Sequence, residues 1–116
     1  MMPRRKYIYA QREIEKYYSV IKKFSEAQIH QHLYTNGTLA TEETLKALGE
    51  AGLNEIRFNL GASNCSDKVI ENIGLAKKYI KSVGIETPMT PEFFDVFFKK
   101  KQAIFETKLD FINCAE

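Results

Sequence analysis

Residues 41–58, T-E-E-T-L-K-A-L-G-E-A-G-L-N-E-I-R-F, contain one complete step from a helix to a strand. Thr41 is a typical helix N-cap, two glutamates follow it in the first turn, and leucines three residues apart form one apolar face. Gly52 stands where a left-handed residue commonly ends a helix, and a short apolar run bounded by turn residues comes next. The stretch predicts a helix over 42–51 and a strand over 55–60.

The same alternation continues on both sides of this unit. Three more stretches carry apolar residues at helical spacing, and three more short apolar runs separate or follow them. The runs begin at intervals of roughly 26–29 residues, close to the length of a strand, a crossover helix and the next parallel strand. The order αβαβαβαβ predicts repeated βα units in one domain over 1–116. The other expected helices are 10–24, 67–82 with Gly84 after its end, and 91–107, and the other expected strands are 29–34, 83–87 and 110–114.

The composition limits the functions open to this chain. Its 116 residues include 17 lysines and arginines against 15 aspartates and glutamates, and 44% are hydrophobic. This is ordinary for one globular domain, no stretch is apolar enough for a membrane span, and a net charge of +2 does not favour nucleic acid as a partner. The basic start lacks the apolar run of a secretory signal, so we expect a cytoplasmic protein. Cys65 and Cys114 are too far apart for a C-x-x-C site.

Polar residues end all four expected strands. In parallel sheets and βα barrels, ligands bind beyond the carboxyl ends of the strands, which meet at one rim. Hydroxyl, carboxamide and carboxylate groups there could hydrogen-bond a small molecule, and Arg57 could hold a carboxylate through two hydrogen bonds. Turns need polar residues too, so each residue alone also fits a purely structural role. The strand-end residues are Thr35, Asn36, Arg57, Asn59, Glu86, Thr87, Asn113 and Glu116.

The order and spacing of these segments resemble one enzyme superfamily. Residues 32–39, H-L-Y-T-N-G-T-L, and 45–58, L-K-A-L-x-x-A-G-L-x-E-I-R-F, look like the third and fourth strands of radical S-adenosylmethionine (radical SAM) enzymes. Residues 83–88, V-G-I-E-T-P, and 110–113, D-F-I-N, look like the fifth and sixth. The resemblance covers residues 10–116. It implies an α/β fold in which about four parallel strands with flanking helices form a partial (β/α) barrel, half of a radical SAM (β/α)6 barrel.

The resemblance also implies cofactors for a complete family member. Such enzymes bind a [4Fe-4S] cluster and S-adenosylmethionine (SAM), which the cluster cleaves reductively to a 5′-deoxyadenosyl radical. The family's cluster loop, C-x-x-x-C-x-x-C, and the Gly-Gly-Glu turn that holds the SAM amino group do not occur in this sequence. Cys65 and Cys114 cannot replace a three-cysteine loop, so we expect no cluster in this chain. The chain then resembles a fragment of a radical SAM enzyme that is inactive alone.

Roles for the strand-end residues follow from the resemblance, one position at a time. Thr35 and Asn36 match the strand end that lies beside bound SAM in the family. Asn59 matches a polar residue that contacts the ribose or the carboxylate of SAM, and Arg57 is a second candidate for that contact. The remaining roles are cofactor binding for Glu86 and substrate binding for Thr87, Asn113 and Glu116.

Three other features suggest simpler interpretations. His30 and His32 alternate on one strand without an evident third metal ligand, so a structural pair is the better interpretation. We interpret the lysines at 99–101 as solvated charge. The phenylalanines between 93 and 105 are expected to pack the last helix onto the sheet as part of the core.

Two other functions remain open beside the radical SAM fragment. One is a stand-alone half-barrel that binds a small ligand at the same rim, and the other is a protein-interaction domain without catalysis. We expect a small-molecule ligand and no membrane or nucleic-acid partner. We also expect self-association or pairing with the remainder of the barrel, because the outer strands of a half-barrel have unpaired edges.

Overall fold

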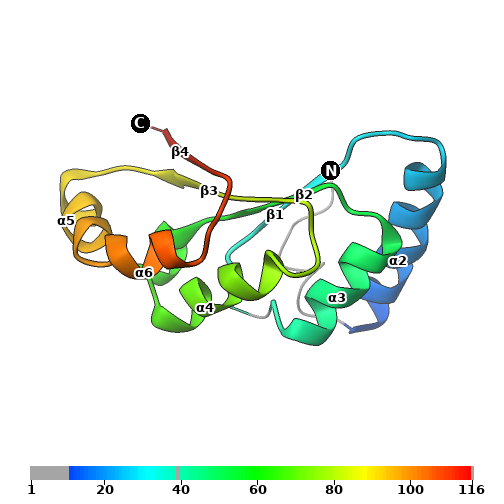
Figure 1. The fold of residues 1–116 in the computed structure, drawn as a ribbon, viewed down its shortest axis with the longest axis horizontal. Coiled ribbons are helices and arrows are strands. Elements are labelled where there is room, and N and C mark those ends of the chain that lie inside the picture. Colours follow the sequence, from blue (N-terminus) through cyan, green and yellow to red (C-terminus); the bar gives the residue numbers. More distant parts are fainter. Residues whose placement is uncertain (1–10, 39, 116) are drawn as a thin grey trace.

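The computed structural model describes residues 11–38 and 40–115, in which helices and strands alternate as expected (Figure 1). The one short helix that was not expected, η1, follows the second strand. The elements are α2 (Gln11–Glu26), β1 (His32–Thr35), α3 (Glu42–Ala51), β2 (Glu55–Phe58), η1 (Leu60–Ser63), α4 (Asp67–Ala76), β3 (Ser82–Pro88), α5 (Pro91–Lys99), α6 (Lys101–Glu106) and β4 (Phe111–Ala115).

The four strands form one parallel sheet in the order β1-β2-β3-β4. Each strand therefore pairs with the next one in sequence, as repeated βα units require. One row of directly paired residues crosses the whole sheet: Tyr34, Arg57, Gly84 and Phe111. This arrangement confirms the predicted α/β fold with four parallel strands and flanking helices.

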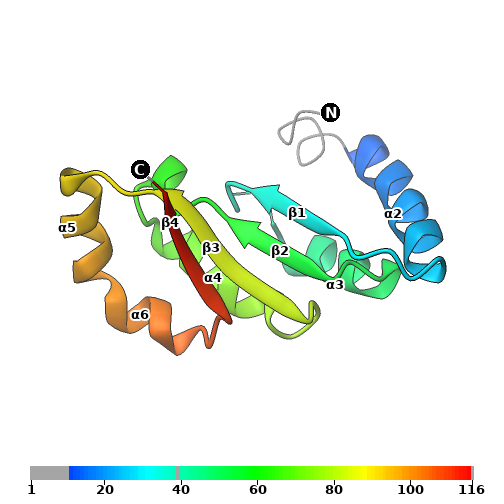
Figure 2. The same cartoon turned by 90° about the horizontal axis from the view of Figure 1, so that it is seen from above.

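Helices α3 and α4 lie against one face of the sheet, α2 and the pair α5 and α6 lie toward its two edges, and no described helix covers the other face, which we call the open face (Figures 1 and 2). Alternate strand residues such as Leu33, Ile56 and Val83 are buried, and together with the helices they form the core. Helices on a single face are typical of a barrel wall, whereas a doubly wound sheet has helices on both faces. Among the described residues no helix is both long and apolar enough to cross a membrane.

Helix α3 begins and ends where its local sequence signals predict. The Thr41 side chain accepts a hydrogen bond from the Thr44 N–H, and Gly52 has a φ of 102° in the left-handed region. An added Cβ on Gly52 would also lie 2.2 Å from the Ser25 hydroxyl oxygen. The predicted span of 42–51 is confirmed at both ends.

The helix expected over 67–82 is shorter than predicted. Helix α4 ends at Ala76, and hydrogen-bonded turns lead to β3, which begins at Ser82. Tyr79 and Ile80 continue the helical spacing of apolar residues but pack from the connecting segment instead. Gly84 was expected after the end of this helix but lies inside β3, where the Phe111 ring occupies the space that a side chain would need.

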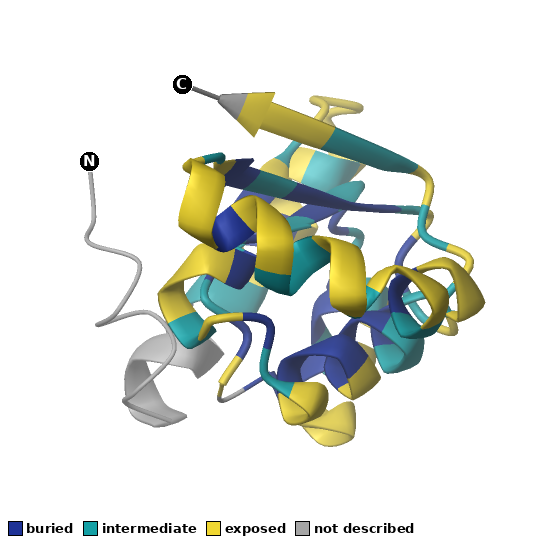
Figure 3. Ribbon diagram, turned by 90° about the vertical axis from the view of Figure 1, so that its left-hand side faces the viewer, coloured by how far each residue is buried: buried dark blue, intermediate teal, exposed yellow. Residues whose placement is uncertain are grey.

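The helix expected over 91–107 consists of α5 and α6, separated at Lys100. Phe93 is buried, whereas Phe94, Phe98 and Phe105 have exposed fractions of 48%, 53% and 61%. Figure 3 views this end of the molecule, where much of the helical surface is exposed. The expectation that all these phenylalanines join the core was therefore wrong. They lie on more than one side of α5 and α6, and only one side can face the sheet.

Candidate functional site at the strand ends

The parallel sheet brings the carboxyl ends of all four strands to one rim (Figure 2). The strand-end residues divide into two groups there because alternate side chains point to opposite faces. Thr35 and Thr87 lie on the helix side and are almost fully buried. Arg57, Glu86 and Asn113 lie on the open face, where they are half-buried or exposed. Glu116 lies outside the described residues.

On β1, hydrogen bonds fix the turn that follows Thr35. The Gly37 N–H donates to the Thr35 hydroxyl oxygen over 3.0 Å, and the Asn36 side-chain oxygen accepts from the Thr38 N–H over 3.1 Å. Gly37 has a φ of 82°, and a Cβ there would lie 2.7 Å from the Phe58 ring. The buried Thr35 therefore stabilises the turn through its side chain, while Asn36 is half-buried at the rim.

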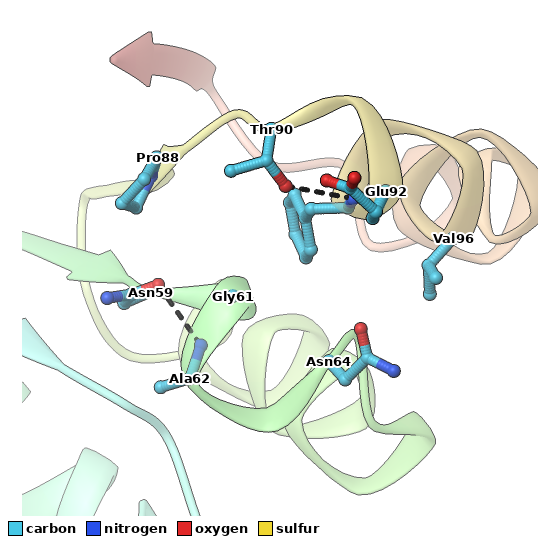
Figure 4. Close-up of a pocket in the computed structure, with 9 residues that line it drawn as sticks. Asn59, Gly61, Ala62, Asn64, Pro88, Thr90, Glu92 and Val96 are labelled. Carbon is cyan, nitrogen blue, oxygen red and sulfur yellow. Dashed lines mark hydrogen bonds between the residues drawn. The ribbon is translucent and has the colours of Figure 1, made fainter. Parts of the chain in front are cut away.

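The buried Thr87 hydroxyl links the ends of β2 and β3. It donates to the Asn59 side-chain oxygen over 3.1 Å and accepts from the Gly61 N–H over 3.1 Å. The same Asn59 oxygen accepts from the Ala62 N–H over 3.3 Å and so caps η1 (Figure 4). The described residues provide no hydrogen-bond partner for the Asn59 Nδ2, so this amide can still donate to a ligand.

A pocket of about 470 Å³ opens beside this linkage, between η1 and the start of α5 (Figure 4). We call it the rim pocket. Its walls are largely apolar, and Asn59 and Glu92 add a carboxamide and a carboxylate. Such a pocket suits a flat or apolar group that carries a few hydrogen-bonding atoms. Its lining residues are Asn59, Gly61, Ala62, Asn64, Pro88, Thr90, Glu92, Phe93 and Val96.

A network of charged and aromatic side chains lies on the open face. The Arg57 Nη1 donates to the Glu86 carboxylate over 2.8 Å and to the Tyr34 hydroxyl over 3.0 Å, and its Nε donates to Glu55. The Tyr34 and Phe111 rings each lie 5.5 Å from the guanidinium carbon. We call these five residues the open-face cluster.

The cluster contacts set the protonation of its members. Hydrogen bonds from Tyr34, Asn113 and Arg57 hold the pKa of Glu86 below its usual value, although burial opposes them. The hydrogen bond with Glu86 and burial raise the pKa of Tyr34. The hydrogen bond with Glu55 raises the pKa of Arg57. At neutral pH Arg57 is therefore a cation between carboxylates, and Tyr34 is a neutral donor.

The sequence reasoning missed Tyr34, Glu55 and Phe111 in this cluster and Glu92 in the rim pocket. Alternation along the strands could have placed Tyr34 on the same face as Arg57 and Glu86. The register then pairs Tyr34 directly with Arg57. Nothing in the local sequence pointed to Glu92, because it resembles any acidic residue in a first helical turn.

The cysteines and histidines do not assemble a metal site. Cys65 is fully buried, and burial raises the pKa of its thiol, whereas Cys114 is exposed on β4. The His30 Nε2 lies 3.7 Å from a Glu55 oxygen. Among the residues that the structure describes, no group of three histidine, cysteine or acidic side chains could hold a metal ion. Two separated thiols do not fit a [4Fe-4S] cluster, which needs three or four positioned thiolates.

Comparisons with known proteins give one significant match among curated proteins. Over 90 residues the chain is 40% identical to a protein of Methanocaldococcus jannaschii described as a "putative glycyl-radical enzyme activating enzyme". The match covers 72% of this chain and 24% of the relative, so the chain spans about a quarter of that protein's length. No family model matches, and no solved structure matches significantly.

The description of the relative names the activation of a glycyl-radical enzyme. The similarity of this chain to that protein supports the resemblance of its strand sequences to radical SAM enzymes. Four parallel strands with flanking helices also agree with half of a radical SAM barrel. Over these residues the chain is therefore similar to part of a protein with that description, in agreement with its resemblance to radical SAM enzymes.

Proposed function

We propose that this chain is the part of a radical SAM enzyme that forms one wall of its SAM and substrate site. The observation that carries the proposal is the placement of polar groups. The buried core occupies one face of the sheet, and the rim and the open face hold an arginine, carboxylates and carboxamides. The [4Fe-4S] cluster would come from another part of the protein, because the cysteines of this chain do not fit it.

The rim offers donors and a pocket for SAM. The rim pocket is large enough for a nucleoside portion, and the Asn59 Nδ2 would donate to a ribose hydroxyl or to the SAM carboxylate. Asn36 would approach the ligand from the neighbouring strand end. When bound to the cluster of the complete protein, SAM supplies the radical chemistry.

The open-face cluster would contact the substrate. Arg57 is already paired with two carboxylates, so the cluster has a formal excess of one negative charge. The relative is named for activating a glycyl-radical enzyme. We propose the same activity for the protein to which this chain corresponds, in which case the substrate is a segment of another protein that would lie along the open face.

Asn59→Asp tests the SAM assignment. An aspartate keeps the oxygen that caps η1 and accepts from Thr87, but it removes the free donor and adds a negative charge. In the complete cluster-containing protein we expect about tenfold weaker SAM binding, as the loss of one hydrogen bond predicts. Binding is measured by equilibrium dialysis and turnover by the release of 5′-deoxyadenosine.

Asn54→Asp is the matched control for this experiment. Asn54 precedes β2, at the opposite end of the strands from the rim, and its oxygen accepts from the Gln31 N–H over 2.8 Å. An aspartate keeps this acceptor, so SAM binding should not change. Equal SAM affinity in wild type and Asn59→Asp would contradict the proposal.

A stand-alone ligand-binding domain is the second candidate, because the rim pocket is formed entirely by this chain. Titration calorimetry of the 116-residue chain with adenosine and with SAM separates the two functions. The fragment proposal predicts dissociation constants near or above about 1 mM, since most ligand contacts would be missing. Micromolar binding by the isolated chain would favour the stand-alone function. A cytoplasmic location and pairing with the remainder of the barrel belong to the fragment proposal.

A further inference from the structure

Asn72 is a polar residue in the interior of the helix layer, outside the site described above. It lies on α4 with an exposed fraction of 1%. Its Nδ2 donates to the Gly37 carbonyl oxygen over 2.8 Å, a contact between residues 35 positions apart in sequence. Among the described residues its Oδ1 has no hydrogen-bond partner.

The lack of a partner for the Asn72 Oδ1 among the described residues indicates which part of this side chain is useful. Burying an acceptor without a partner costs free energy, so an apolar side chain of similar size would suit the packing at least as well. Rotating the amide would not help, because its oxygen would then face the Gly37 carbonyl oxygen. The useful part of the Asn72 side chain is therefore its donor.

That donor holds the turn after β1 at its central residue. Gly37 is restrained at its N–H by the Thr35 hydroxyl and at its carbonyl by Asn72. The Cα of Gly37 also packs closely against Phe58 and Val69, which leave no room for a side chain. These restraints determine how the preceding residue, Asn36, is presented at the rim.

We infer that Asn72 is a positioning residue whose amide fixes the turn at 35–38, so that Asn36 and the turn backbone meet SAM in one orientation. The inference rests on the proposed function for its ligand, although the link between Asn72 and the turn does not. It predicts that the loss of the donor weakens ligand binding without destabilising the fold.

Asn72→Leu in the 116-residue chain tests the link to the turn. The Gly37 amide should exchange its hydrogen about tenfold faster, because one of the bonds that close the turn is lost. The thermal midpoint should stay the same or rise, since the unmatched oxygen is removed as well. Asn54→Leu, which breaks a comparable bond to Gln31 at the other end of the sheet, should leave Gly37 exchange unchanged. Asn72→Met, which also lacks the donor, replaces the leucine variant if that one does not fold.

The same variants in the complete cluster-containing protein test the effect on SAM. We expect Asn72→Leu to raise the dissociation constant of SAM several-fold, with the maximal rate at saturating SAM little changed, and Asn54→Leu to change neither. Unchanged Gly37 exchange in Asn72→Leu, or equal loss of SAM affinity in Asn54→Leu, would overturn the inference. If the wild-type protein bound no SAM, the proposed function would fail, and Gly37 exchange alone would decide the role of Asn72.

Discussion

Gly84 illustrates at the scale of single residues how a missing side chain shapes the candidate site. It pairs with Arg57 on one side and Phe111 on the other, and a Cβ at Gly84 would lie 2.3 Å from the Phe111 ring. The ring can therefore lie across the glycine and reach the Arg57 guanidinium. We predict that Gly84→Ala displaces the ring and lowers the free energy of unfolding by about 1–3 kcal/mol, as overpacking usually does. Gly74→Ala within α4 is the control, because the nearest side-chain atom to its added methyl group, on Thr107, lies 4.0 Å away, and helix propensity should make the change neutral or stabilising. Urea unfolding measures both changes, and equal stability of the two variants would show that Phe111 does not need the space above Gly84.

Helices α3 and α5 mark, at the scale of elements, the limit of what the sequence could predict. Caps such as Thr41 and Gly52 are local signals, so α3 was predicted to the residue. The parallel order of the strands likewise placed the candidate site at one rim. The burial of Thr87 was not foreseen, because it depends on the packing of η1 against β3, and η1 itself was not predicted. The phenylalanines of α5 have helical spacing on more than one side, and only packing decides which side is buried. We therefore predict that Phe93→Ala lowers the free energy of unfolding by about 3–5 kcal/mol, whereas Phe98→Ala lowers it by less than about 1 kcal/mol. Guanidinium unfolding checks the difference, and similar losses would mean that both rings are packed in solution.

At the scale of the whole molecule, apolar side chains and unpaired strand edges of the described residues are exposed at both ends, as is typical of proteins that associate. The helices pack in the order α2, α3, α4 and α6, and large apolar side chains are exposed at the two ends of this layer. Within the described residues, β1 and β4 pair with a neighbouring strand on one side only. The open face, in contrast, carries the charged open-face cluster. Association should therefore depend on the free edges of β1 and β4 and on the apolar side chains at the two ends of the helix layer. We predict that light scattering at micromolar concentration shows a dimer or larger species, and that serine at all three exposed phenylalanines of α5 and α6 shifts it toward the monomer. The control places serine at three exposed polar positions of α3, where no change in association is expected. A wild-type chain that is a uniform monomer with a sharp, high melting transition would contradict the prediction, because the sheet edges would then need no partner. The three phenylalanines are Phe94, Phe98 and Phe105, and the control positions are Glu43, Lys46 and Glu50.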